Sequence, residues 1–210
     1  NAVIIGTGTQ TYTGVSQALS DVDISSSSDW WGQTFVTSSR TIGIKSLTFG
    51  IKNTGGSTDN YAVSIRTSSA NVPTGSDIET KTATAAVNNG VDGDVTFTFA
   101  TPVSVSPSTT YAIVLRKTSG ASGSGPKYKN SNAYANGNYS TSSNSGSTWT
   151  ADTAKDFRFS TTDIYTNAGQ VYKATALANN EFVNNFIGFV IGSFSAGQTA
   201  TILVVGQTTN

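Results

Sequence analysis

Alternating apolar and polar residues over residues 94–117 constrain the fold more than any other feature of this chain. Within Val95–Phe99 the apolar residues alternate with threonines, which is the two-residue period of a strand with one buried face. The same period returns over Tyr111–Leu115, after a turn region that contains Pro107. We expect these two strands to form an antiparallel pair at the centre of a β-sandwich, because their apolar face needs a second layer.

Further segments carry weaker strand patterns. Residues 44–52 and 61–66 alternate in the same way on either side of a Gly-rich turn, so we expect them to form a hairpin. Residues 78–83 predict a more polar strand near an edge, and residues 156–159 predict a closing strand. No segment has a convincing helical period. The sequence therefore predicts an all-β protein.

The composition of the chain changes near Thr166. Beyond it, three apolar runs separated by turn-rich segments predict a small β-module over residues 166–210, after a sandwich over residues 25–165. Residues 1–24 are expected to be an N-terminal arm or a first strand. Three short strands make a marginal fold unless another surface covers them.

One strand of this C-terminal module is apolar along its whole length, which indicates that both of its faces are covered. Each buried aliphatic side chain contributes roughly 1.5–3 kcal/mol, so exposing such a strand is costly. We therefore predict a subunit interface and a homo-oligomer, with the interface residues Ile202, Leu203, Val204 and Val205.

The composition excludes several classes of function. The chain has no His and no Cys, so a Ser-His-Asp triad, a thiolate nucleophile and a zinc-thiolate site are excluded. The formal net charge is zero, which argues against a nucleic-acid partner and against a polybasic membrane patch. No apolar run approaches the roughly 18 residues that a membrane-spanning helix needs. Only 11% of residues are charged, so Ser, Thr, Asn and Gly must cover the surface.

Aromatic residues near the polar segment 118–147 are the best candidates for binding a sugar, since a flat aromatic ring can stack on a pyranose. Trp30 and Trp31 are adjacent, so in a strand they point to opposite faces and one of them can be exposed. The alternative is that Trp31 and Trp149 seal the edges of the sandwich. The candidate glycan-binding residues are Trp30, Tyr128, Tyr134, Tyr139 and Trp149.

Two acidic residues, Asp92 and Asp94, flank a glycine before the central strands and could supply oxygen ligands to Ca²⁺. The alternative is an Asx-stabilised turn, which needs no metal. Glycoside hydrolysis would need two opposed carboxylates. Neither Glu79 nor Glu181 has an acidic partner nearby in the sequence on a strong strand, so we expect no enzymatic activity.

A set of short motifs runs through about residues 28–160: Trp31–Phe35, Ile44–Phe49, Pro73–Gly75, Val95–Phe99, Thr109–Leu115, Trp149 and Asp156–Phe159. Through these motifs the first part of the chain resembles the β-sandwich modules of bacterial and phage surface proteins. Such domains are jelly-roll-like and similar to carbohydrate-binding modules. The resemblance implies a jelly-roll-like antiparallel β-sandwich with a role at a surface.

The last part of the chain resembles a small β-module of phage fibre and capsid-cement proteins, through residues 168–174, 188–190, 195–201 and 205–206. Together the two resemblances imply a non-enzymatic virion surface protein, a fibre or capsid decoration, with other virion proteins and a host-surface glycan as partners. The alternatives are a secreted or cell-surface bacterial carbohydrate-binding or adhesion module and, third, a glycosidase.

Overall fold

A computed structural model describes the side chains of residues 30–120 and 123–165. It also describes the backbone of residues 5–11, 21–22, 166, 189–190 and 202–203. The chain divides into two compact units, Asn1–Ala168 and Gly169–Asn210.

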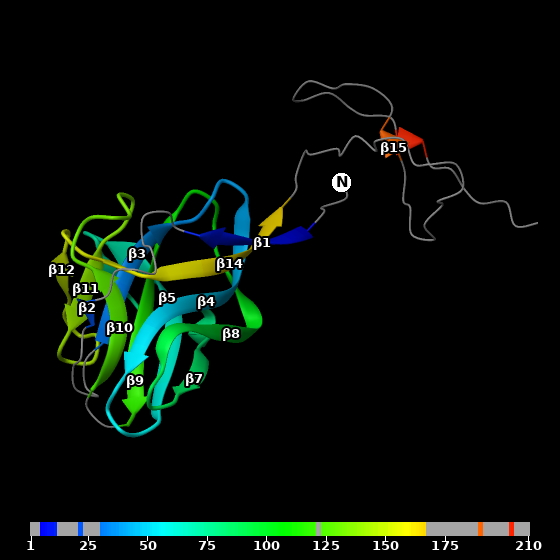
Figure 1. Ribbon diagram of the computed structural model, residues 1–210. Helices are drawn as coiled ribbons and strands as arrows, with labels where there is room; N and C mark the ends of the chain where they lie inside the picture. The colour runs from blue at the N-terminus through cyan, green and yellow to red at the C-terminus, as the bar shows by residue number, and fades with distance from the viewer. Residues whose placement is uncertain are drawn as a thin grey trace, which may run out of the picture. The chain divides into compact units, whose positions relative to one another are not determined.

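Two antiparallel sheets pack together in the first unit and form an all-β sandwich, as the sequence predicts (Figure 1). The first sheet has the order β1 (Ile5–Thr11), β14 (Phe159–Thr166), β4 (Thr41–Asn53), β10 (Ser124–Lys129) and β13 (Asp156–Phe157). In addition, β8 (Asp92–Ser104) pairs with β4, and β2 (Asp21–Val22) pairs with β10.

The second sheet has the order β12 (Thr150–Asp152), β11 (Tyr139–Ser142), β3 (Trp30–Val36), β9 (Thr110–Ser119), β5 (Asp59–Ser69) and β6 (Val72–Thr74). β7 (Ala83–Val87) also pairs with β5. A 3-10 turn at Ile78–Thr80 lies between β6 and β7.

Aromatic rings from the first sheet fill the middle of the core. Phe49 of β4 lies edge-on to Phe97 of β8 and to Phe157 of β13, with ring centroids 6.2 and 5.8 Å apart. It also stacks with Phe159 of β14 at 6.4 Å, and Phe159 in turn contacts Phe35 of the second sheet. These rings tie four strands of one sheet to the facing sheet, and each contact adds to the free energy of simple apolar burial.

The predicted pairing of the central strands is wrong. β8 and β9 follow each other in the chain, but β8 pairs with β4 in the first sheet and β9 pairs with β3 and β5 in the second. The expected hairpin of residues 44–52 and 61–66 is wrong for the same reason, because β4 and β5 also belong to different sheets. In both cases the chain crosses the sandwich, so the apolar faces meet across the core.

Two local expectations also need correction, and the polar segment contains strands that the sequence pattern does not indicate. Residues 78–83 begin as a 3-10 turn, and the strand β7 starts only at Ala83. The polar segment 118–147 contains two strands, β10 and β11. The predicted closing strand is divided at Arg158 into β13 and β14.

In the second unit, β15 (Phe189–Val190) and β16 (Ile202–Leu203) form an antiparallel pair. The side chains of Ile202 and Leu203, and both Val204 and Val205, lie outside the described residues. The subunit interface assigned to them therefore stays a prediction.

Candidate functional site

Two of the predicted glycan-binding tyrosines are core residues. Tyr139 is 3% exposed and its ring lies 4.9 Å from that of Phe157. Tyr134 is 9% exposed, packs edge-on to Phe159 at 5.9 Å, and accepts a hydrogen bond from the backbone N–H of Val36 at 3.0 Å. This differs from the prediction, because both rings pack in the sandwich and leave no face on which a sugar could stack.

Tyr128 and Trp149 are both half-buried. The ring of Tyr128 lies 5.6 Å from that of Tyr139, and the Lys155 ammonium lies 5.1 Å from the Tyr128 centroid. Trp149 directly precedes β12. The structure thus leaves Tyr128 and Trp149 partly accessible, with a cation beside the tyrosine.

Adjacent tryptophans point to opposite faces of β3, as expected from the alternation of a strand. Trp31 is fully buried in the core, which agrees with its predicted packing role. Trp30 is half-buried on the outer face of the second sheet. It is packed against a neighbouring loop, since a Cβ on Gly146 would come within 2.6 Å of its ring.

Trp30 belongs to a cluster of five residues that we call the Asp77 cluster. The guanidinium carbons of Arg66 and Arg116 lie 5.3 and 4.7 Å from the Trp30 ring centroid, within the range of cation–π attraction. Each arginine also donates to the Asp77 carboxylate at 2.7 Å, and Ser64 donates to it at 2.8 Å. Burial alone would raise the pKa of Asp77, but the hydrogen bonds from Arg116, Arg66 and Ser64 outweigh it and hold the pKa below its usual value.

On the outer face of the second sheet, β6 lies over the middle of β3. Gly32 of β3 makes the cover fit, because a Cβ there would lie 2.7 Å from Pro73 Cγ and 2.4 Å from Ser140 Oγ. The neighbouring Ala112 and Val114 of β9 are fully buried. A segment of the same chain therefore occupies the surface on which a sheet-binding ligand would lie.

Asp92 and Asp94, the predicted Ca²⁺ ligands, lie in the strand β8 and form ion pairs. Asp92 pairs with Lys127, and Asp94 pairs with Arg158 at 2.6 Å. The hydrogen bond from Lys127 is the main reason that the pKa of Asp92 is lowered. Gly50 of β4 leaves room for both cationic side chains, since a Cβ there would lie 3.0–3.3 Å from their carbons. Within the described part of the chain, no three acidic, His or Cys side chains gather in one place.

Two other buried carboxylates are held by neutral donors. Asp156 accepts hydrogen bonds from Gln33 at 2.9 Å and from the backbone N–H groups of Ala133 and Tyr134 at 2.8 Å. Asp163 accepts from the hydroxyls of Thr41 and Thr161. Burial raises the pKa of both groups, and the hydrogen bonds only partly offset it.

Sequence reasoning missed a second cluster, which we call the Lys117 cluster: Asp59, Tyr61, Lys117 and Ser124. Lys117 and Asp59 form an ion pair at 2.7 Å, and both side chains are 0% exposed. A signal was present, because Lys117 stands two residues after Leu115 and therefore on the same, inward face of the strand. The apolar residues of this strand end at Leu115, so the apolar pattern alone does not mark the inward lysine.

No protein-family model matches the chain, and no curated protein matches it either. Among the described residues, no helix is long and apolar enough to cross a membrane.

We predict that Asp77→Ala destabilises the sandwich by roughly 2–3 kcal/mol at pH 7, because it leaves Arg66 and Arg116 partly buried without their carboxylate. Urea unfolding at pH 7 measures the loss. The matched control is Asp152→Ala, which removes a more exposed pair with Lys155 and should cost about 0–1 kcal/mol. The lowered pKa of Asp77 means that its contribution is present above about pH 4 and is lost as the pH falls through the folded-state pKa. Equal losses for the two variants at pH 7 would contradict this role.

We predict that Asp163→Asn makes stability less dependent on pH between about 4 and 7. The raised pKa of Asp163 favours folding at low pH, and this advantage disappears as the pH rises through the folded-state value. An Asn amide can donate to Thr41 while Thr41 donates to Ser38, whose oxygen lies 2.7 Å away. Urea midpoints measured across this range should therefore show a gain for the variant, relative to the parent, that grows with pH. A difference that is constant or shrinks with pH would refute the assignment.

Proposed function

We propose that this chain is a non-enzymatic structural protein of a virion surface, either a fibre or a capsid-decorating component. The proposal rests on how the buried carboxylates are paired. In the described part of the chain, the four most buried carboxylates each accept hydrogen bonds or ion pairs from donors within the sandwich itself. The carboxylates are those of Asp59, Asp77, Asp156 and Asp163.

This arrangement suits a scaffold better than a hydrolase. A general acid or base must reach the proton that it transfers, directly or through one water. Asp156 and Asp163 have raised pKa values, which is a property of many catalytic acids, but both are buried and point toward backbone, amide or hydroxyl donors. Their environment is explained by packing of the sandwich, which supports the structural role.

The resemblance of the two parts of the chain to phage and bacterial surface modules supports the surface location. A sandwich with few charged residues and many hydroxyl and amide groups can stand in solvent without a basic or acidic face. The alternative, a secreted or cell-surface bacterial adhesion module, rests on the same sandwich and differs in where the protein is assembled.

Binding of a host-surface glycan is a second candidate function, and partly accessible aromatic residues favour it. Trp149 follows a run of exposed polar residues, and Tyr128 carries the Lys155 ammonium beside its ring. Trp30 is less suitable, because two guanidinium groups and Gly146 already pack against it. Glycan stacking is therefore proposed at two separate residues, Tyr128 and Trp149.

We expect antibodies against the sandwich to label regular positions on virions released from the bacterium that encodes the chain. Immunogold electron microscopy of purified particles, and of the same cells before particle release, measures this. Labelling confined to the surface of cells that release no particles would favour the bacterial module and contradict the virion assignment.

For glycan stacking, we expect weak binding, in the micromolar to millimolar range, on an array of cell-surface glycans. Trp149→Ala and Tyr128→Ala should each lower the affinity about tenfold, which corresponds to about 1.4 kcal/mol. Tyr165→Ala is the matched control, since Tyr165 is a half-buried tyrosine that is not one of the two proposed residues and lies beside Arg40. No binding by the folded parent chain, or equal losses for all three variants, would remove this second function.

A further inference from the structure

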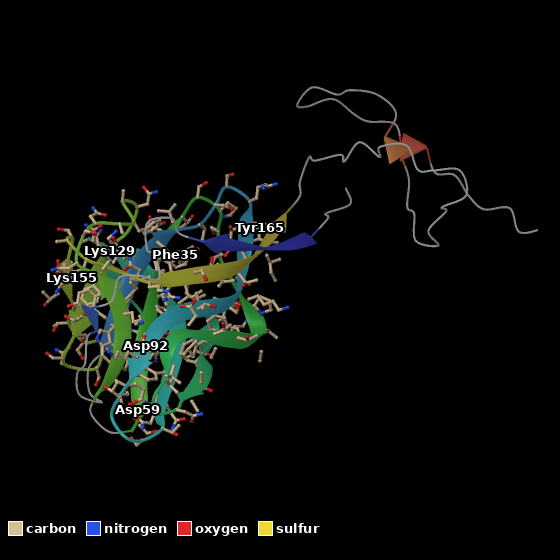
Figure 2. The ribbon with its side chains drawn as sticks, in the orientation of Figure 1. Phe35, Asp59, Asp92, Lys129, Lys155 and Tyr165 are labelled. Carbon is tan, nitrogen blue, oxygen red and sulfur yellow. The ribbon has the colours of Figure 1, made fainter. Side chains whose placement is uncertain are left out.

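The Lys117 cluster places an amine and a carboxyl group in contact, fully buried, on two neighbouring strands. Lys117 of β9 pairs in register with Tyr61 of β5, and Asp59 stands two residues before Tyr61. Asp59 lies at the end of the sandwich where the chain turns from β4 into β5 (Figure 2). The Nζ of Lys117 is 2.7 Å from Oδ2 of Asp59, so the carboxyl carbon is one bond beyond that contact.

A serine hydroxyl bridges the two groups. Ser124 Oγ donates to the Asp59 carboxylate and accepts a hydrogen bond from Lys117 Nζ at 3.1 Å. The hydroxyl of Tyr61 lies 2.6 Å from the same Oγ. Since the serine proton is directed at Asp59, Tyr61 must be the donor in that contact. Burial raises the pKa of Tyr61 to about 12, so this donor keeps its proton at neutral pH.

The chain closes over the carboxyl group and excludes water. Gly120 follows β9 with a positive φ of 119°, and a Cβ there would lie 1.9 Å from Oδ1 and 2.5 Å from Cγ of Asp59. Only a glycine backbone can approach the carboxyl so closely. In this buried site the ammonium and the carboxylate lack the hydration that stabilises both ions in bulk water.

We propose that Lys117 and Asp59 condense to form an amide, a covalent cross-link between β9 and β5 within the same chain. The inference goes beyond the proposed function and does not depend on the chain being a virion protein. It assigns a self-modification site that requires no cofactor and no second protein.

The reaction balances with the groups present. A proton passes from the Lys117 ammonium to the Asp59 carboxylate, which gives a neutral amine and a carboxylic acid. The nitrogen lone pair then attacks Cγ, and Ser124 relays the proton from nitrogen to the departing oxygen. The Cγ–Nζ bond forms, one Cγ–O bond breaks and one water leaves, with no oxidation or reduction. Holding reactants in contact in this way is worth an effective concentration of about 10⁵–10⁸ M in well-oriented cases.

Other lysine–carboxylate pairs of the described chain differ in their access to water. Lys155 and Asp152 are 29% and 37% exposed, and Lys81 and Glu79 are 27% and 40% exposed. Water hydrates these ions and favours them over an amide. Burial of both partners, together with a bridging hydroxyl, is what distinguishes Lys117 and Asp59.

Mass spectrometry of the denatured full chain tests the cross-link. We expect the parent protein to be one water lighter than its sequence mass. A tryptic digest should contain a branched peptide that joins residues 53–66 to residues 117–127, because trypsin does not cleave after an acylated lysine. Lys155→Met is the matched control and should keep the same deficit of one water relative to its own mass.

Removal of either reacting group, in Lys117→Met or Asp59→Ala, should restore the full mass. Ser124→Ala retains both groups and should slow cross-linking at least tenfold in a time course of freshly refolded protein. The proposal is overturned if folded parent protein has its full sequence mass after prolonged incubation. It is equally overturned if a water is lost but residues 53–66 and 118–127 are recovered as separate peptides, since a succinimide at Asp92–Gly93 would then account for the loss.

Discussion

The crossing of the chain between the two sheets is the constraint on which the sandwich depends. From β3 to β5, and again from β7 to β11, each step from one strand to the next passes from one sheet to the other. Between these two ranges the chain stays in the second sheet, through β6. Within each range, strands that follow each other in the chain therefore lie in opposite sheets, and the inward side chains of the two sheets must fit together. The ring of Phe49 meets this requirement on one side, and Phe35 reaches Phe159 from the other. In such a sandwich the apolar face of each sheet is buried only when the other sheet packs against it.

Sequence patterns predicted the inward faces of the strands but not the sheet to which each strand belongs. Alternation identifies Leu47, Phe49 and Ile51 as one buried row, and all three are fully buried. It cannot distinguish a hairpin partner from a strand in the facing layer, because both present the same period. The alternation does not indicate β10 and β11, because Ser, Thr, Lys, Gly and Pro make up most of their residues and leave no apolar row. β10 forms a strand because it pairs with β4, and β11 because it pairs with β3. Such tertiary pairing cannot be predicted from local strand propensity.

The candidate sites were less predictable than the fold because their chemistry depends on contacts between distant residues. Asp77 meets Arg116 across 39 positions of sequence, and Asp59 meets Ser124 across 65. Composition indicated that charges are few, yet it did not indicate that several of them are buried. The inward position of Lys117 follows from the strand period alone. The close approach of the Gly120 backbone to the Asp59 carboxyl group does not, because it depends on the folded structure. Residue type alone suggests the aromatic residues as sugar-stacking candidates, but it does not show which of them are buried. Tyr134 and Tyr139 lie in the core.

The ion pairs on the outer face of the first sheet have a consequence for how this surface meets other molecules. Lys127 and Arg158 lie across β4 and pair with two carboxylates of β8, so these four charges cancel beside threonine hydroxyls such as those of Thr48 and Thr96. Long-range electrostatic steering needs an excess of one sign of charge. The four paired groups therefore add little to any long-range attraction, and what they offer a partner is shape and short-range hydrogen bonds, which depend only weakly on ionic strength.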